Sequence, residues 1–179
     1  MIKIIACMSI NNVLGFQGGM PWGKFSADLK RFKNLTINNT VVMGRKTAES
    51  IKKPLENRNN IILTKDSEES LIYGPFKNCS ICNSLSDLTQ LLYNNNDDRD
   101  IFIIGGGEIY KTFLPFTNTI YLTVINKFYQ GDTYFPIIDN KIWKETEREE
   151  FIETDKFPYL YSFITLERYH KVLTDIRFN

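Results

Sequence analysis

One carboxylate stands out in the segment GGMPWGKFSADLKRF, residues 18–32, because of the helix face on which it falls. At about 100° per residue, Phe25, Leu29 and Phe32 form a narrow apolar stripe, and Asp28 lies at the edge of that stripe. The opposite, polar face is predicted to carry Lys30, Arg31 and Asn34. A carboxylate directed toward the core side of a helix can bind a ligand or take part in proton transfer. Asp28 is therefore the first candidate for chemistry.

A purely local explanation of Asp28 is also open at this point. Ser26 is a candidate N-cap of the helix, since its hydroxyl can accept a hydrogen bond from a backbone N–H of the first turn. An acid in the first turn also interacts favourably with the positive end of the helix dipole. On local grounds alone, Asp28 would be a helix-start residue with no chemical role.

Phosphate binding is indicated where three predicted strands end. The strand VVM is followed by GRKT, the strand IIL by TK, and the strand IFII by GGG. Open parallel sheets bind ligands beyond these carboxyl ends, and the cations suit a ribose 2′-phosphate, which points to NADP rather than NAD. Glycine-rich turns let backbone N–H groups face a phosphate. The set comprises residues 105–107, Arg45, Lys46, Thr47, Thr64 and Lys65.

Arg58, in the segment PLENR, is a second candidate for ligand binding. Near an apolar cleft, its guanidinium could hold a ligand carboxylate in a bidentate pair. The alternative is an ordinary solvated arginine on the surface.

The elements that must position these residues alternate along the chain. Apolar runs predict strands, and amphipathic stretches between several of them predict helices. The predicted strands cover 2–10, 40–43, 60–64, 79–82, 101–104, 119–126 and 159–167, and the predicted helices 26–35, 46–52, 84–93 (with Ser84 as N-cap) and 107–113. This alternation predicts an α/β domain with a mainly parallel sheet. The last two strands, joined by a long polar connection through GDTYFP and KETEREEF, are expected to form an antiparallel pair at one edge.

Composition narrows the class of protein. The 179 residues suit one domain, and 42% of them are hydrophobic and 24% charged. The formal net charge of +1 does not indicate nucleic-acid binding, and no apolar stretch reaches the roughly 20 residues of a membrane span. Three cysteines, an odd number, suit a reducing cytosol, and one histidine cannot complete a zinc site with Cys79 and Cys82. We expect a cytoplasmic protein that requires no metal, membrane or nucleic acid.

Several ordered motifs extend these observations to a family. MPWGKFSADLKRFK, VVMGRKTAESI, PLENRNNIILT, IIGGGEIYKTFLP, IYLT and GDTYFP closely resemble dihydrofolate reductase, and the likeness runs from the first strand to YSFITLER at 161–168. The resemblance implies a central mixed, mostly parallel eight-stranded sheet flanked by four helices, with an antiparallel C-terminal strand pair. It implies one domain over 1–168, with 169–179 as a C-terminal extension of unassigned role.

The resemblance also implies a reaction. Members of the family reduce 7,8-dihydrofolate to 5,6,7,8-tetrahydrofolate with NADPH, by hydride transfer to pterin C6 and protonation at N5. The product feeds one-carbon and thymidylate metabolism. Dihydrofolate and antifolate inhibitors are then the expected small-molecule partners, and the protein is expected to be a monomer.

Site residues follow by motif. Asp28 matches the pterin-binding acid, Thr123 the threonine that hydrogen-bonds it, and Trp22 the tryptophan that helps hold an ordered water. Met20, with Gly15, Gly18 and Gly19, matches the mobile loop over the nicotinamide, and Tyr110 completes the catalytic set. The implied substrate-binding residues are Ile5, Ala6, Asp28, Leu29, Phe32, Ile51, Leu55, Arg58, Ile104 and Thr123, with Arg58 paired to the α-carboxylate of the glutamate moiety.

The implied cofactor site is larger. It comprises Ala6, Cys7, Leu14, Gly15, Gly18, Gly19, Gly44, Arg45, Lys46, Thr47, Leu63, Thr64, Lys65, Gly105, Gly106, Gly107, Glu108, Ile109 and Tyr110. The family carries a cis peptide between the first two glycines of GGG. Ala48 stands where bacterial members often have a bulky aromatic residue, which predicts a more open pocket rim.

Two other functions are weighed against this one. The pyrimidine reductase of riboflavin synthesis shares the fold and uses NADPH, but it should lack the MPW…D loop and the Arg58 anchor, both present here. A non-catalytic module retained for binding is the second alternative. It would be expected to have lost some of Asp28, Trp22, Arg58, Thr123 and the three glycines, and all of them are intact.

Overall fold

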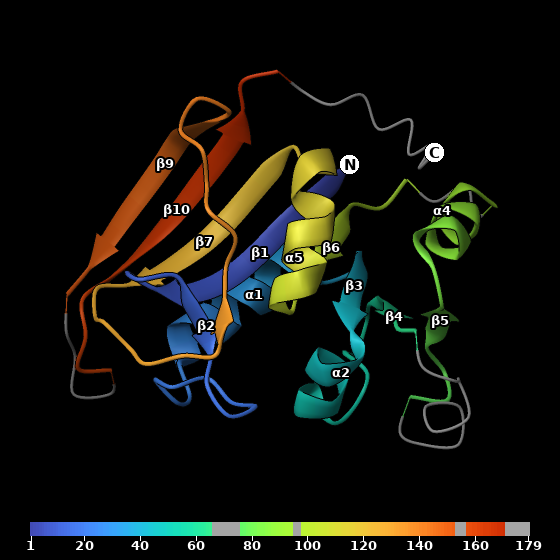
Figure 1. The fold of residues 1–179 in the computed structure, drawn as a ribbon, viewed down its shortest axis with the longest axis horizontal. Coiled ribbons are helices and arrows are strands. Elements are labelled where there is room, and N and C mark those ends of the chain that lie inside the picture. The colour runs from blue at the N-terminus through green and yellow to red at the C-terminus, as the bar shows by residue number, and fades with distance from the viewer. Residues whose placement is uncertain (66–75, 95–97, 153–156, 171–179) are drawn as a thin grey trace.

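The structure, a computed structural model, describes residues 1–65, 76–94, 98–152 and 157–170 (Figure 1). Its centre is an eight-stranded sheet in the order β5-β4-β3-β6-β1-β7-β10-β9. The strands are β1 (Ile2–Ser9), β3 (Thr40–Gly44), β4 (Asn59–Leu63), β5 (Ser80–Cys82), β6 (Ile101–Ile103), β7 (Thr119–Ile125), β9 (Trp143–Phe151) and β10 (Tyr161–Arg168). Every pairing from β5 to β7 is parallel, and β10 runs antiparallel to both β7 and β9. The predicted mixed, mostly parallel sheet with an antiparallel C-terminal pair is confirmed, but the expected pair, β7 and β10, does not form the edge of the sheet, which β9 occupies.

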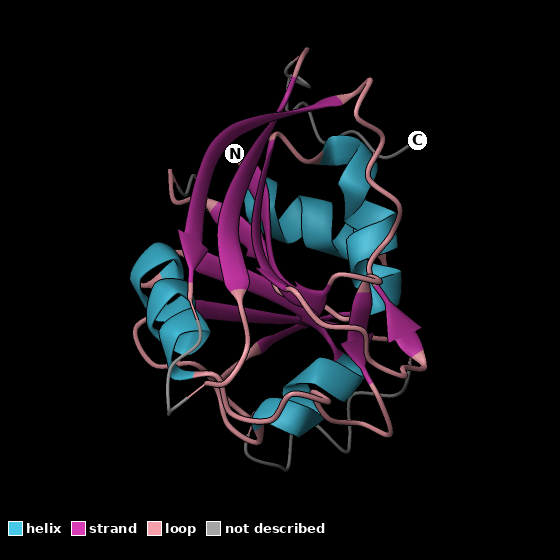
Figure 2. Cartoon of the chain, turned by 90° about the vertical axis from the view of Figure 1, so that its left-hand side faces the viewer, coloured by secondary structure: helices cyan, strands magenta, loops and turns pink. Residues whose placement is uncertain are grey.

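Helices cover both faces of this sheet (Figure 2). Within the described residues they are α1 (Ser26–Thr36), α2 (Arg45–Ile51), α4 (Leu85–Asn94), α5 (Gly107–Phe113) and a short 3-10 helix, η1 (Leu114–Phe116). Ser84 caps α4 as predicted, because its hydroxyl accepts a 3.0 Å hydrogen bond from the Asp87 N–H. None of the helices in the described part of the chain is long and apolar enough to cross a membrane.

The core lies on both sides of the central strands. Ile4 of β1 belongs to a buried cluster that includes Phe113 of α5, whereas its neighbour Ile5 belongs to a second cluster that includes Ala48 of α2. Successive residues of a strand point to opposite faces, so a strand buried on both faces is continuously apolar. This is why the apolar runs located the strands. The parallel direction then brings the segments after β1, β3 and β6 to one edge of the sheet.

Three strands depart from the prediction. The segment KETEREEF, expected to be part of a connection, belongs to the edge strand β9, and β2 (Val13–Gly15) and β8 (Thr133–Tyr134) form a separate two-stranded sheet. Almost every side chain of β9 is exposed, so the strand has no apolar pattern. It is held by its pairing with β10, and charged residues are typical of exposed sheet edges.

Two details of α1 also differ from the prediction. Phe25 occupies the N-cap position and no side chain caps the helix, so the expected Ser26 cap is wrong. Arg31, expected on the polar face, is only partly exposed and reaches the sheet. Arg31 is three residues from Asp28 and so lies on the same side of the helix. Of the predicted C-terminal extension, 171–179 lies outside the described residues.

Candidate active site

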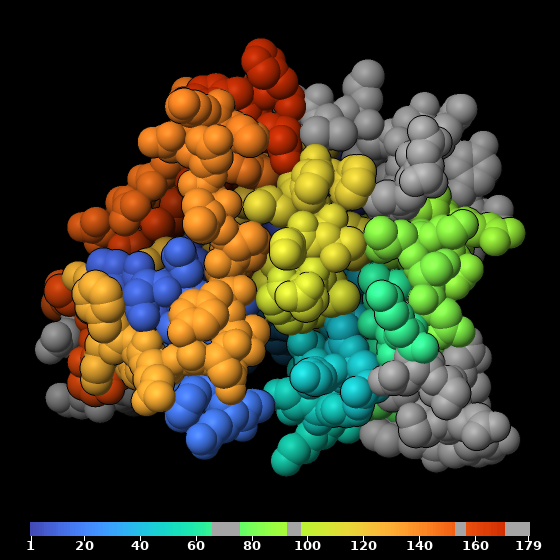
Figure 3. Space-filling view, in the orientation of Figure 1, coloured from blue at the N-terminus to red at the C-terminus, as the bar shows by residue number. Residues whose placement is uncertain are grey.

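A cleft of about 1820 Å³ opens beside the carboxyl ends of the strands β1, β3 and β6. Figure 3 shows its opening between the blue loop near residue 20 and the cyan segment around α2. All the predicted site residues line this cleft except Trp22, Thr64, Lys65 and Thr123. Residues scattered over the first 110 positions therefore meet in one space.

Asp28 opens onto the cleft from the first turn of α1. The hydroxyl of Thr123, a buried residue of β7, hydrogen-bonds its carboxylate. Burial raises the pKa of Asp28 above its ordinary value, while the Thr123 hydrogen bond and the nearby Arg31 charge act in the opposite direction. The apolar side chains near it come from α1 and β1, notably Leu29, Phe32 and Ile5. A carboxylate in such surroundings can hold a proton closer to neutral pH than an exposed one.

Trp22 belongs to the loop that precedes α1. It is buried and meets Tyr129 edge to face, with 5.7 Å between the ring centres. Its indole N–H has no hydrogen-bond acceptor among the described residues. Met20, two residues earlier, is 46% exposed and lines the cleft. The two residues thus hold different places, because Trp22 is buried outside the lining of the cleft and Met20 lies at its opening.

The loop carrying Met20 is attached to the segment around β8. The Asp132 carboxylate accepts a 2.8 Å hydrogen bond from the Gln17 N–H, and the Asp132 N–H donates one of 3.0 Å to the Gly15 carbonyl. The hydrogen bonds that the Asp132 carboxylate accepts from the Gln17 N–H and the Thr133 hydroxyl lower its pKa. Phe16 and Gly19 also pair across the loop. Asp132 was not predicted as a site residue, although the motif GDTYFP contains it.

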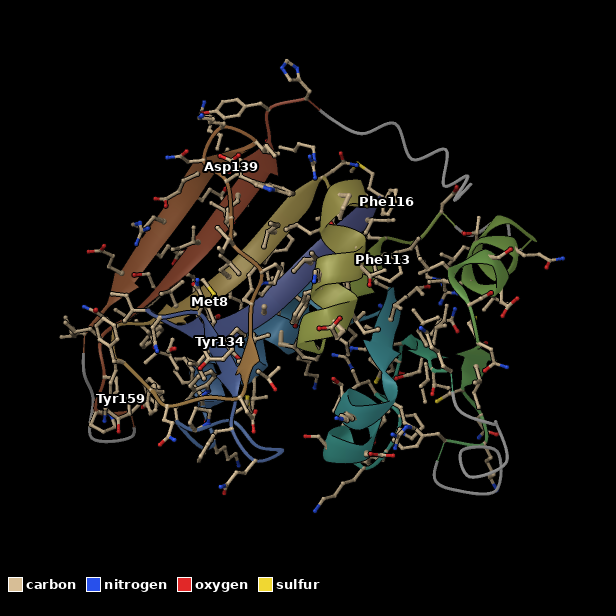
Figure 4. All side chains as sticks on the ribbon, viewed as in Figure 1. Met8, Phe113, Phe116, Tyr134, Asp139 and Tyr159 are labelled. Atoms are coloured by element: carbon tan, nitrogen blue, oxygen red, sulfur yellow. The ribbon has the colours of Figure 1, made fainter. Side chains whose placement is uncertain are left out.

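Where residues 105–107 line the cleft, their backbone lies very close to neighbouring residues. The peptide between Gly105 and Gly106 is cis, as the resemblance implied. Gly105 has φ of +113°, and a Cβ there would lie 3.1 Å from the Tyr110 hydroxyl. A Cβ on Gly107 would lie 2.9 Å from the Tyr134 carbonyl oxygen of β8, the residue labelled in Figure 4. Only glycine fits these two positions without displacing neighbours.

Tyr110 supports this end from inside. Its hydroxyl donates a 2.8 Å hydrogen bond to the Ile5 carbonyl, and burial raises its pKa. The phenol therefore stays protonated at neutral pH. Its hydrogen bond fixes α5 against β1.

Cations gather at the start of α2. Arg45, Lys46 and Thr47 line the cleft, and Arg45 forms an ion pair of 2.6 Å with Glu49 on the next turn. Thr64 and Lys65 follow β4, the next strand outward, and the structure does not bring them to the lining. Thr64 is buried and Lys65 is exposed.

Arg58 also lines the cleft, and hydrogen bonds to neighbouring residues hold its guanidinium in place. Nε donates 2.9 Å to the Thr36 hydroxyl, and Nη1 donates 2.7 Å to the Glu56 carbonyl. Its guanidinium carbon is 5.8 Å from the ring centre of Phe32. A guanidinium held in this way loses little rotamer freedom when it binds a carboxylate.

The expectation for Ala48 is wrong. Ala48 does not line the cleft; it is fully buried in the same cluster as Phe76. Its neighbours in α2 face the cleft instead, so a small residue here does not widen the rim. Sequence reasoning also missed several lining residues that belong to otherwise ordinary polar or apolar stretches: Lys33, Ile37, Asn57, Thr133, Tyr134 and Pro136. No group of metal-binding side chains occurs among the described residues.

A cleft at the strand ends of a doubly covered α/β sheet, lined by a partly buried acid, a glycine run and cations, is typical of nucleotide-dependent enzymes. A family model described as dihydrofolate reductase matches residues 1–168. The chain is 36% identical over 167 residues to the dihydrofolate reductase of Staphylococcus haemolyticus, covering 93% of this chain and 95% of that one. It is 40% identical over 158 residues to that of Buchnera aphidicola, with 87% and 89% covered.

A solved structure agrees with these relatives. Dihydrofolate reductase from Enterococcus faecalis, complexed with NADP(H) and RAB-propyl, superimposes with a TM-score of 0.83 at 30% identity, covering 95% of this chain and 97% of that one. The chain belongs to the dihydrofolate reductase family.

Proposed function

We propose that this protein reduces 7,8-dihydrofolate to 5,6,7,8-tetrahydrofolate with NADPH, and that Asp28 binds the pterin and promotes protonation at N5. The observation that carries the proposal is the Asp28 carboxylate, partly buried, hydrogen-bonded to Thr123 and open to the apolar end of the cleft. Family membership supports the same reaction.

The residues around Asp28 suit the two demands of this chemistry. A pterin presents an amidine-like pair of N–H groups, and an ionised carboxylate can accept two parallel hydrogen bonds from them, one on each oxygen. Protonation at N5 instead requires a proton near neutral pH, and burial raises the pKa of Asp28 in that direction. Thr123 orients the carboxylate by its hydrogen bond. The Met20 loop, tied to Asp132, lies at the opening of the cleft, where it can limit the access of water to a bound substrate.

The other end of the cleft suits a dinucleotide phosphate. Gly106 and Gly107 leave part of the backbone accessible without side chains to cover it, and Thr47 approaches Gly106. Arg45 and Lys46 would hold the 2′-phosphate through charge-assisted hydrogen bonds. When bound, NADPH supplies the hydride. The protein contributes position, electrostatics and exclusion of water.

The two alternatives make different use of the same cleft. A pyrimidine reductase has no need of the oriented Arg58, because its substrate lacks the glutamate carboxylate that this residue would bind. A binding module has no need of a carboxylate with a raised pKa. We further propose that the protein is a cytoplasmic monomer whose functional domain is 1–168.

The test of the function is a turnover assay with product identification. Purified protein should consume NADPH only when dihydrofolate is added, and should form tetrahydrofolate in equal amount. The pyrimidine substrate of riboflavin synthesis should give no turnover. Folded protein that binds NADPH without reducing dihydrofolate would overturn the proposal in favour of the binding module.

Cofactor choice gives a second prediction. Replacing both Arg45 and Lys46 with alanine should raise the KM for NADPH about 10- to 100-fold, because charge-assisted hydrogen bonds to the 2′-phosphate are lost. The KM for NADH should stay within about twofold. Lys52→Ala, at the far end of α2 and outside the lining residues, is the matched control. Equal losses for NADPH and NADH would remove the 2′-phosphate role.

A further inference from the structure

Arg31 has an unusual environment for a residue of an amphipathic surface helix. Its Nη1 donates a 2.8 Å hydrogen bond to the Leu122 carbonyl of β7, and its Nη2 lies 3.5 Å from the Ile164 carbonyl oxygen of β10. The guanidinium carbon is 4.5 Å from the ring centre of Phe163 and 5.8 Å from that of Tyr121. Carbonyl oxygens and aromatic faces both stabilise a cation, so the charge is fixed on the sheet.

This fixed charge is linked to Asp28 in two ways. Asp28 and Arg31 are three residues apart on α1, so their side chains start on the same side of the helix. Leu122, which accepts the hydrogen bond of Arg31, immediately precedes Thr123, which hydrogen-bonds Asp28. Two adjacent residues of β7 therefore hold two residues of one helical turn. The arrangement fixes the carboxylate and the guanidinium relative to each other.

Within the described part of the chain, the other titratable groups that face Asp28 are uncharged at neutral pH. Cys7 of β1 and Tyr110 of α5 face it, and burial raises the pKa of both, so both are neutral at neutral pH. Thr123 of β7 is uncharged. Arg31 is therefore the charged neighbour that acts on the Asp28 carboxylate, and it lowers the pKa that burial raises.

Other groups face Arg31 from the opposite side. Glu147 and Glu149 of β9 and Tyr121 of β7 interact with its charge. Both glutamates are exposed, so water and salt screen them strongly. They do not neutralise Arg31 toward the buried side, where Asp28 lies.

We propose that Arg31 is a positioning residue, a fixed cation behind the pterin-binding carboxylate that offsets part of the cost of burying the Asp28 charge. This role rests on the proposed function of Asp28. Burial alone would raise the pKa of Asp28 further and so favour the protonated carboxyl, which cannot accept both pterin N–H groups. Arg31 favours the ionised form of Asp28, which binds the pterin. The pKa of Asp28 nevertheless stays above its ordinary value, as proton delivery requires.

The direct test is a titration of the Asp28 carboxyl by carbon NMR in aspartate-labelled protein, assigned by its loss in Asp28→Asn. Arg31→Gln removes the charge but keeps an N–H donor for the Leu122 carbonyl. It should raise the titration midpoint by about one pH unit. Arg31→Lys keeps the charge and should stay within about 0.3 unit of the wild type. Arg31→Met, an apolar side chain able to cover Phe163, is a second neutral variant, used where Arg31→Gln is poorly folded.

Arg148→Gln is the matched control. Arg148, on β9, forms ion pairs with Glu145 and Glu150 on the exposed edge and does not contact α1 in any described interaction. Its removal should leave the Asp28 midpoint unchanged. A midpoint that does not move in the neutral Arg31 variants overturns the proposal. So does an equal shift in Arg31→Gln and Arg31→Lys, because that would indicate lost packing rather than lost charge.

The pH profile of kcat/KM for dihydrofolate provides a second readout. In the neutral Arg31 variants its pH-dependent limb should move to higher pH together with the NMR midpoint. A profile that stays in place while the midpoint moves would overturn the role in the reaction. Absence of dihydrofolate turnover in the wild type would refute the proposed function, whereas the NMR titration would still decide whether Arg31 acts on Asp28.

Discussion

Replacing Asp28 with asparagine should lower kcat for dihydrofolate at neutral pH by about 100- to 10,000-fold, the range typical of a lost proton-transfer group. The amide has the same shape and can still accept a hydrogen bond from Thr123. It cannot hold the ionisable proton, and it presents only one acceptor oxygen to the pterin. Steady-state kinetics with saturating NADPH measure the effect. Unchanged turnover at neutral pH would defeat the role given to Asp28.

Two controls isolate this effect. Asp28→Glu keeps a carboxylate and should retain far more activity than Asp28→Asn. The KM for NADPH should be unaffected in both variants, because Asp28 is not among the cations and glycines that would hold the cofactor. A parallel loss of NADPH binding would point to a general disturbance of the cleft.

The same substitution should not destabilise the protein at neutral pH. The pKa of Asp28 is higher in the folded state than its ordinary value, so the unfolded chain loses this proton at lower pH than the folded one. Stability therefore falls as pH rises through the ordinary pKa toward the folded one, and the cost is fully present above both. Asparagine removes that cost. Thermal unfolding at neutral pH should give a Tm for Asp28→Asn equal to or above that of the wild type; a clear decrease would contradict the sign.

Replacing Arg58 with leucine should raise the KM for dihydrofolate about 30- to 100-fold, because a bidentate charge pair with the glutamate carboxylate is lost. The guanidinium is held in advance by Thr36 and the Glu56 carbonyl, so its binding requires little ordering. The KM for NADPH should change less than about twofold. Steady-state kinetics with each substrate varied in turn provide both values.

A substrate change provides the control for Arg58. 7,8-Dihydrobiopterin has the pterin ring but no glutamate, so Arg58→Leu should leave its KM unchanged. Arg58→Lys keeps the charge without the planar fork and should fall between the wild type and leucine for dihydrofolate. Equal losses for both substrates would mean that Arg58 supports the structure of the cleft rather than the carboxylate.

The parts of the structure that could be predicted are those with a strong local signal. Central strands such as β1 and β3 are buried on both faces, which requires unbroken apolar runs. The cations after β3 and the glycines after β6 could be placed together because parallel strands end at one edge. The motifs that resemble a family then assigned Asp28, Arg58 and Thr123 to one site. These residues lie too far apart in the sequence for their spacing alone to connect them.

The parts that escaped prediction depend on tertiary contacts. β9 is held by its pairing with β10 and has no apolar pattern to reveal it. The helical pattern predicts a surface position for Arg31. Its long side chain could extend to water, but here it reaches a carbonyl of another element. Asp132 lies more than 100 residues from the loop it holds. None of these contacts leaves a periodic or compositional trace.

The central claim is that Asp28 promotes the protonation that accompanies hydride transfer. It is tested most directly by the rate of hydride transfer in a single turnover, measured across pH for the wild type and Asp28→Asn. The wild-type rate should fall as pH rises, through one titration above the ordinary range of an aspartate. In Asp28→Asn that titration should disappear, and the residual rate should recover only at acid pH, where the substrate itself is protonated. The same pH profile in both proteins would contradict the account.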